Sequence, residues 1–166
     1  MAPLGTRAFF CYQLINIIGI FYQCMYGNHT SIMKRTIEVT AAIIIHESRI
    51  FAAQRGYGDQ KDGWEFPGGK MEPGETAEDA IIREIKEELE VEIKPEKLLV
   101  TVEYDYPKFH LTMHCFISSI VSGHILLTEH EAAKWLLPCE LETVDWLPAD
   151  VEVAEKLKEY LAGKNH

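Results

Sequence analysis

The sequence has few basic residues compared with acidic ones. Its 16 lysines and arginines are outnumbered by 26 aspartates and glutamates, and the formal net charge is −10. Proteins bind polymeric nucleic acid through a basic surface, so this balance argues against such a partner. It does not exclude a small anionic substrate, because a bound metal ion can neutralise the charge of a local site.

The sequence also lacks paired cysteines, internal repeats and low-complexity segments. None of its four cysteines lies in a C-x-x-C pair, which predicts reduced thiols in a cytoplasmic protein. Of its 166 residues, 47% are hydrophobic and 25% are charged, an ordinary composition for one domain with a buried core. We expect a monomer or a homodimer.

Charged residues are absent from residues 8–26, which are apolar and aromatic with three amides interspersed. This stretch is only marginally long enough to span a membrane. The sequence after Met33 has the pattern of a domain start. We therefore predict that residues 1–32 are an apolar extension, disordered or non-native, and that residues 33–166 form the functional domain without a membrane partner. A membrane-associated segment and a packed helix are the alternatives for the extension.

Residues 36 onward carry several strand patterns. Apolar, β-branched and aromatic runs bounded by turn residues predict paired strands at 36–46 and 49–55 and two more at 97–107 and 110–121. A short strand is predicted in 64–69, stopping at Pro67 and two glycines, and 144–150 is predicted to close a strand. Residues 129–136 are predicted to be a loop or short turn.

Two helices complete the predicted α+β fold, in which helices pack on a mixed sheet. The first follows the N-cap Thr76, with Asp79 forming an approximate capping box, and has an apolar seam at positions 77, 81, 85 and 89. The second is predicted at 151–163, with Asp150 as its N-cap and Gly163 as its end.

Three glutamates stand at i, i+3 and i+4 in the first helix: Glu84, Glu87 and Glu88. Like charges at these spacings repel one another, and the three cover an arc of roughly 100° beside the apolar seam. Arg83 and Lys86 fall elsewhere on the helical wheel. Converging carboxylates are hard ligands that suit Mg²⁺ or Mn²⁺, and such ions serve phosphoryl chemistry. A solvated acidic face is the alternative.

The glutamates belong to a longer pattern of fixed spacing. Gly69 is followed after five residues by Glu75, and after seven more by the run R-E-I-K-E-E-L-E-V at 83–91. This segment resembles the Nudix box, G-x5-E-x7-R-E-U-x-E-E-x-G-U with U aliphatic, except that Glu90 replaces its last glycine. E-F-P-G-G-K before the box and W-L-P-A-D near the end are similar to the MutT-type branch. The resemblance covers residues 33 to about 161.

The resemblance implies a Nudix-type α/β/α sandwich whose strand–loop–helix–loop unit binds a divalent cation. The expected cation is Mg²⁺, with Mn²⁺ as the alternative. The implied ligands are the carboxylates of Glu84, Glu87 and Glu88 and the carbonyl oxygen of Gly69, with Glu87 and Glu88 the most important.

The resemblance also implies an ion pair between Glu75 and Arg83. An arginine fork binds a carboxylate bidentately, so this pair would hold the glycine-rich loop against the helix. Glu90 would occupy a left-handed helix C-cap, at a cost near 1 kcal/mol, without removing a metal ligand.

The substrate implied by the resemblance is a nucleoside diphosphate linked to a further group. Arg55, at the end of the second strand, would reach substrate phosphate, and Lys70 would lie close to the metal. Ordinary surface charge is the alternative for both. Glu129 is the first candidate for the general base, Glu131 the second and Glu88 the third; a solvated loop carboxylate is the alternative for Glu129.

Candidates for nucleobase contacts are Phe66, Tyr106, Phe109 and Asp150. Phe66 is equally well explained as a core residue and Asp150 as a helix cap. A carboxylate accepts from an exocyclic amine such as cytosine N4. The predicted function is hydrolysis of a (deoxy)nucleoside triphosphate, a pyrimidine (CTP or dCTP) or an oxidised nucleotide, to the monophosphate and pyrophosphate in nucleotide-pool sanitation. The alternatives are an 8-oxo-dGTP diphosphatase, a hydrolase of another nucleoside diphosphate derivative, and a non-catalytic nucleotide-binding module.

Overall fold

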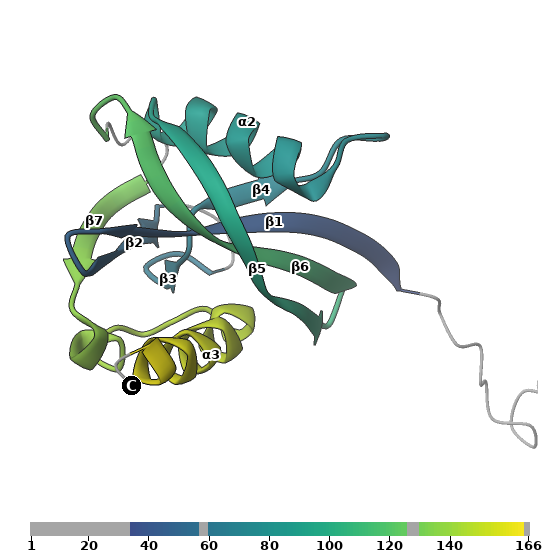
Figure 1. Cartoon of the computed structure of the whole chain (residues 1–166). Helices are drawn as coiled ribbons and strands as arrows, with labels where there is room; N and C mark the ends of the chain where they lie inside the picture. Colours follow the sequence, from purple (N-terminus) through teal and green to yellow (C-terminus); the bar gives the residue numbers. More distant parts are fainter. Residues whose placement is uncertain (1–33, 57–59, 126–129, 165–166) are drawn as a thin grey trace, which may run out of the picture. The chain divides into compact units, whose positions relative to one another are not determined.

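A mixed seven-stranded sheet forms the centre of the fold in this computed structural model (Figure 1). The structure describes residues 34–56, 60–125 and 130–164, without the side chains of residues 130 and 131. The predictions for residues 1–32 and for Glu129 lie outside these ranges. The strands are β1 (Arg35–His46), β2 (Arg49–Arg55), β3 (Trp64–Glu65), β4 (Gly68–Lys70), β5 (Glu92–Asp105), β6 (Phe109–Ser122) and β7 (His130–Leu136).

The main path through the sheet runs in the order β3-β2-β1-β6-β5, with β4 paired to β1 and β7 paired to β2. β1 pairs with β6 in parallel and with β2 and β4 in antiparallel orientation. Two helices accompany the sheet, α2 (Ala77–Leu89) and α3 (Pro148–Lys164), together with a 3-10 turn, η1 (Pro138–Glu140).

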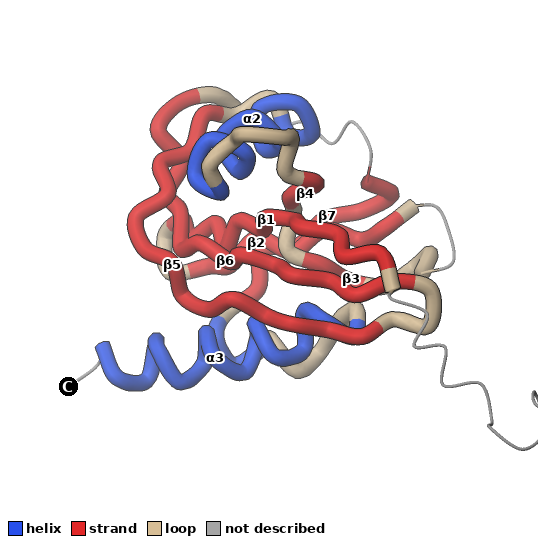
Figure 2. The backbone as a smooth tube through the Cα atoms, turned by 90° about the vertical axis from the view of Figure 1, so that its right-hand side faces the viewer, coloured by secondary structure: helices blue, strands red, loops and turns tan. Residues whose placement is uncertain are grey.

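The helices cover opposite faces of the sheet (Figure 2). On β1, Ala41 and Ile43 face the core that α3 closes, whereas Ala42 and Ile44 face the core under α2. Successive strand residues point to opposite faces, so a strand covered on both sides needs an unbroken apolar run. The run at 41–45 is therefore explained by two helical layers, and the predicted α+β fold with helices on a mixed sheet is confirmed.

The capping and the seam predicted for the first helix are present in α2. The Thr76 hydroxyl accepts from the Asp79 backbone N–H at 3.1 Å and donates to its carboxylate at 2.7 Å. The buried side chains of α2 are Ala80, Ile81, Ile85 and Leu89. The C-cap is Glu90, with φ of 59° and ψ of 19°, so this glutamate does occupy the left-handed position.

The short strand predicted to stop at Pro67 is present as β3, which ends at Glu65, but the following strand β4, which begins at the two glycines and pairs with β1, was not predicted. Two other predictions about strands were wrong. Residues 130–136 form β7, since Ala132 to Leu136 pair along β2. Residues 144–150 form no strand, and their pairing is limited to a bridge between Trp146 and Trp64.

The last helix differs from its prediction at both ends. α3 begins at Pro148, so Asp150 lies in its first turn and is not its N-cap, and the helix continues through Gly163 to Lys164. Proline is well suited to a first helical turn, which the prediction overlooked.

The described part of the chain contains two cysteines, Cys115 and Cys139, and both are free. Among the described residues, no helix is long and apolar enough to cross a membrane.

Replacing Glu90 with glycine should stabilise the protein. Glycine adopts the left-handed C-cap conformation without the steric cost of a side chain, so we expect the free energy of unfolding to rise by about 0.5–1 kcal/mol in urea titrations. Glu78→Gly, in the first turn of the same helix, should instead lower it by about 1 kcal/mol. Destabilisation by Glu90→Gly would show that the glutamate side chain contributes more than its backbone strain removes.

Candidate active site

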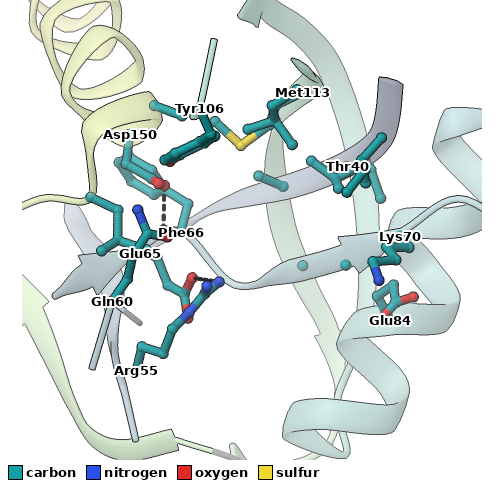
Figure 3. A pocket seen from close by; sticks show the side chains of 18 of the residues that line it. Thr40, Arg55, Gln60, Glu65, Phe66, Lys70, Glu84, Tyr106, Met113 and Asp150 are labelled. Carbon is teal, nitrogen blue, oxygen red and sulfur yellow. Dashed lines mark hydrogen bonds and ion pairs between the residues drawn. The ribbon is translucent and has the colours of Figure 1, made fainter. Parts of the chain in front are cut away.

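A cavity of about 520 Å³ extends between α2 and the start of α3. Lys70 and Glu84 lie at one end of it, and Phe66, Tyr106 and Asp150 lie at the other (Figure 3). Its walls include residues of β1, β4, β6 and the β5–β6 turn. The cavity thus joins the helix that carries the glutamate cluster to the candidate nucleobase residues.

The backbone at Gly69 passes close to the carboxylate of Glu84, which would have to move if this residue had a side chain. Gly69 is the register partner of Thr40 on β1, which fixes the position of β4. A Cβ atom on Gly69 would lie 2.2 Å from Oε2 of Glu84 and 2.3 Å from its Cδ. The first glycine of the pattern therefore allows a carboxylate of α2 to rest directly on the loop backbone.

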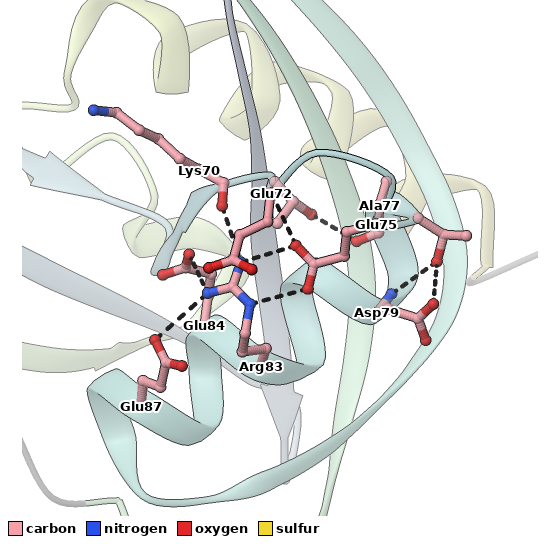
Figure 4. Close-up of polar contacts among 10 residues, drawn as sticks. Lys70, Glu72, Glu75, Ala77, Asp79, Arg83, Glu84 and Glu87 are labelled. Atoms are coloured by element: carbon pink, nitrogen blue, oxygen red, sulfur yellow. Dashed lines mark hydrogen bonds and ion pairs between the residues drawn. The ribbon is translucent and has the colours of Figure 1, made fainter.

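The guanidinium of Arg83 connects the loop to the helix (Figure 4). Its Nε and Nη2 donate to the two carboxylate oxygens of Glu75, each at 2.9 Å. Nη2 also donates to the carbonyl oxygen of Lys70 at 3.0 Å. The predicted pair between Glu75 and Arg83 is therefore present, and the same side chain holds the end of β4.

Arg83 also contacts the glutamate cluster. Its Nη1 lies 2.7 Å from Oε1 of Glu84 and 3.4 Å from Oε2 of Glu87. The prediction that Arg83 points away from the cluster was wrong. Glu87 is four residues after Arg83, a spacing that makes the two side chains neighbours on a helix, and the long arginine side chain also reaches Glu84. The guanidinium lowers the pKa of Glu75 through its hydrogen bonds, and Glu75 and Glu84 in turn raise the pKa of Arg83.

The chemistry of the donors at this end of the cavity fits a hard divalent cation. Glu84 and Glu88 line the cavity beside Gly69, and Oε2 of Glu88 is buried. The side chain of Glu87 is 62% exposed and is turned toward Arg83. Within the described ranges, no three histidine, cysteine or acidic side chains are gathered closely enough to hold a metal ion. The donors therefore suit the cation in kind, but the predicted convergence of the three glutamates is not present, because Arg83 engages Glu84 and Glu87.

Two cationic residues predicted to meet phosphate both line the cavity. Lys70 is exposed, at the end of β4. Arg55 is paired with Glu65: its Nε donates to Oε1 at 3.1 Å and its Nη2 to Oε2. Glu65 belongs to the site and was missed by the sequence analysis. Glu65 stands between two aromatic residues, Trp64 and Phe66, which are both buried in the structure. A charged residue between two aromatics next to the glycine-rich loop could have indicated a polar contact there.

The far end of the cavity is built around Asp150. Its Oδ1 accepts from the backbone N–H of Phe66 at 2.9 Å, which ties α3 to the loop between β3 and β4. The ring of Phe66 is 3% exposed and stacks on Trp146, with centroids 4.5 Å apart. Phe66 is therefore a core residue, as one of the two interpretations predicted, and it also lines the cavity.

Burial raises the pKa of Asp150 to about 7, and the charge of Glu65 adds to this shift. The hydrogen bond from Phe66 and the charge of Arg55 act in the opposite direction. Near neutral pH, Asp150 can therefore present either a hydrogen-bond acceptor or a donor to the cavity. This dual character distinguishes it from an exposed carboxylate, which is ionised throughout that range.

Two of the three candidates for the general base are close in sequence to the start of β7, and the third, Glu88, belongs to α2 and lines the cavity. Glu131 belongs to β7, and Glu129 immediately precedes the strand in the sequence. Antiparallel pairing places His130 opposite Arg55 at the end of β2. The start of β7 is therefore next to a residue of the cavity wall, although the segment was expected to be a loop.

The buried state of Asp150 predicts a pH dependence of stability. Its pKa is higher in the folded protein than in the unfolded chain, so the folded state binds the extra proton between about pH 4 and 7. As the pH rises across that window, Asp150 alone should therefore lower the free energy of unfolding by about 1.4 kcal/mol per pH unit.

Asp150→Asn should remove this component while keeping an oxygen for the Phe66 N–H. Denaturant titrations of both proteins at several pH values measure the difference, in which all other titrating groups cancel. Parallel curves for the two proteins would contradict the burial argument.

Comparison with known proteins supports the sequence resemblance. Residues 35–161 match the NUDIX domain family. The chain is 34% identical to a CTP pyrophosphohydrolase of Escherichia coli over 122 residues, which cover 73% of this chain and 90% of that protein. It is 32% identical to an 8-oxo-dGTP diphosphatase of the same organism over 128 residues, which cover 76% and 98%.

The fold of this chain also matches a solved structure of the same family. It is the solution structure of the DNA mismatch repair protein MutT, of the Nudix hydrolase family, from methicillin-resistant Staphylococcus aureus. The TM-score is 0.64 at 34% identity, and the match covers 77% of this chain and 99% of that one. The family match includes the glycine-rich loop, the acidic helix and both ends of the cavity. The chain therefore belongs to the Nudix hydrolase family.

Proposed function

We propose that this protein is a divalent-metal-dependent pyrophosphohydrolase of (deoxy)nucleoside triphosphates, with a pyrimidine nucleotide such as CTP or dCTP, or an oxidised nucleotide, as substrate. The products are the nucleoside monophosphate and pyrophosphate. Such an activity serves to cleanse the nucleotide pool, and a cytoplasmic location suits it.

The observation that carries this proposal is the composition of the single cavity described above. One end presents carboxylates, a loop carbonyl and Lys70, which suit a metal-bound polyphosphate. The other end presents two aromatic rings and Asp150, which suit a nucleobase. One elongated cavity with these two ends matches the division of a nucleotide into phosphate and base.

Glu84, Glu87, Glu88 and the carbonyl oxygen of Gly69 would hold the cation, with Mg²⁺ favoured and Mn²⁺ as the alternative. Bound there, it would neutralise phosphate charge and lower the pKa of the attacking water. Glu84 and Glu87 would turn from Arg83 toward the cation. Arg83 would keep its bidentate pair with Glu75, so the loop would stay in place during this change.

The other residues have separate roles in the proposal. Arg55, held by Glu65, and Lys70 would bind the phosphate chain and orient it. Glu129 would accept a proton from the attacking water, with Glu131 and Glu88 as the next candidates. The water oxygen forms a bond to one of the two phosphorus atoms joined by the α–β bridging oxygen. The bond between that phosphorus and the bridging oxygen breaks, which gives the nucleoside monophosphate and pyrophosphate.

Asp150 would select the base. Its ionised carboxylate accepts from the exocyclic amine of cytosine. Its protonated form can instead donate to a carbonyl oxygen. Because its pKa is about 7, both forms are accessible near neutral pH. Phe66 and Tyr106 would pack against the base at the same end of the cavity.

A second candidate substrate is 8-oxo-dGTP. It is favoured by the similarity to an 8-oxo-dGTP diphosphatase, of which the matched region covers 98%. The protonated form of Asp150 gives this candidate a physical basis, because it can donate to a carbonyl oxygen on the purine.

The proposed function predicts pyrophosphate release from one class of nucleotide in the presence of Mg²⁺. A panel of ribo- and deoxynucleoside triphosphates, with 5-methyl and 8-oxo analogues, identifies that class. Glu88→Gln is nearly isosteric and removes one ligand charge, so kcat/KM should fall more than about 100-fold, beyond the loss expected for an outer-shell partner.

Glu78→Gln is the matched control for this experiment. It makes the same change in the first turn of the same helix, at an exposed position outside the cavity. Its kcat/KM should stay within about twofold of the unmodified protein, as for an ordinary surface substitution. Absence of turnover with every triphosphate, or equal activity in both variants, would contradict the proposed function.

A further inference from the structure

The turn between β5 and β6 carries two aromatic side chains into the cavity wall. Tyr106 and Phe109 both line the cavity, and their rings stack with centroids 4.8 Å apart. Tyr106 is also hydrogen-bonded to the side chain of Gln60 and to the backbone of Ala149. The placement of this turn therefore sets the shape of the cavity at its nucleobase end.

The strand residues beside this turn are bound together on the other face of the hairpin. Asp105 and His110 are register partners in β5 and β6. Nδ1 of His110 lies 3.1 Å from Oδ1 of Asp105, and its Nε2 lies 2.7 Å from Oε2 of Glu103. Glu103 also accepts from the Thr112 hydroxyl at 2.8 Å. Because side chains alternate along a strand, these groups support the turn without entering the cavity.

Only the imidazolium form of His110 can donate to both carboxylates at once. Both ring nitrogens face carboxylates, and a neutral imidazole has only one N–H to donate. Hydrogen bonds to Asp105 and then Glu103 raise the pKa of His110, and the pKa values of both carboxylates are lowered. Loss of the proton removes one donor and leaves two carboxylates facing an uncharged ring.

Within the described ranges, the other charged or titratable groups that act on the two carboxylates are Lys34 and His114. Lys34, just before β1, donates to Asp105 at 3.4 Å, and the β1 partner of His110 is the uncharged Thr36. Arg35 is the register partner of Phe109 in the β1–β6 pair. The electrostatic attraction of His114 for Glu103 is weaker than that of His110. The bridge between the two carboxylates is thus made by His110.

We propose that His110 is a positioning residue for substrate binding, which holds the β5–β6 turn, and with it Tyr106 and Phe109, by bridging Asp105 and Glu103. The proposal rests on the proposed function in taking the cavity as the nucleotide site. The bridge is complete below the ordinary histidine pKa of about 6.5 and is lost as the pH rises through the higher value in the folded protein. Nucleotide binding should weaken over that range.

The first test compares KM and kcat of the unmodified protein and His110→Gln between pH 6 and 9. Glutamine donates to one carboxylate but carries no charge and does not titrate. At pH 6, we expect KM to be higher in the variant by about threefold to tenfold, the scale of one exposed hydrogen bond, with kcat nearly unchanged. The ratio of the two KM values should approach one at high pH. Asp150 titrates in both proteins, so its effect cancels in this ratio.

His114→Gln is the matched control. His114 lies on the same face of β6, beside Glu38 at 3.7 Å, but away from the turn. Its KM should follow that of the unmodified protein at every pH. A KM ratio for His110→Gln that is constant with pH, or an equal effect of His114→Gln, would overturn the proposal.

A second measurement needs no substrate. Amide hydrogen exchange of the turn, corrected for the intrinsic pH dependence of exchange, should accelerate as the pH rises in the unmodified protein. In His110→Gln it should already be fast at pH 6. Equal protection of the turn in both proteins would overturn the proposal. Failure of every nucleotide to turn over would instead contradict the proposed function, and exchange would still decide the role of His110.

Discussion

The site depends on the bidentate pair between Arg83 and Glu75. Arg83 is on α2 and Glu75 is on the loop before it, so the pair fixes the loop on the helix that carries the carboxylates. The same guanidinium holds the carbonyl of Lys70 and contacts Glu84, which rests on the backbone of Gly69. Loop, strand end and acidic helix face are thus positioned by one planar group that stays charged at all relevant pH values.

The two-sided burial of β1 explains why one cavity combines groups from both helices. α2 packs on one face of the sheet and α3 on the other, and β4 pairs with β1 between them. After β3, the chain passes Phe66, whose backbone is bound by Asp150 of α3, and reaches Gly69 within three residues. A short segment therefore links the end of the cavity beside Asp150 to the end beside Glu84, and it fixes the spacing between the two groups of residues.

Sequence reasoning predicted what depends on local spacing. The cap at Thr76 and the seam of α2 follow from residue spacing within one helix, whereas the Glu75 pair and the left-handed Glu90 were implied by the resemblance to the Nudix box. It failed where pairing across the sheet decides the structure. β7 contains alanines and a lysine, which disfavour strands, yet becomes a strand because β2 offers an open edge. The Arg83 contact to Glu87 has the i,i+4 spacing of neighbours on a helix and was overlooked, whereas the contact to Glu84 depends on the length of the arginine side chain, which a helical wheel does not show.

We propose that the carboxylates beside Gly69 hold a divalent cation and that Arg83 organises this site. Mn²⁺ binding, followed by electron paramagnetic resonance of the free ion, tests it without any substrate. Glu88→Gln should weaken binding at least about tenfold, and Glu78→Gln should leave it unchanged. Equal Mn²⁺ affinity in Glu88→Gln and the unmodified protein would contradict the account, because the cation would then not depend on this face of α2.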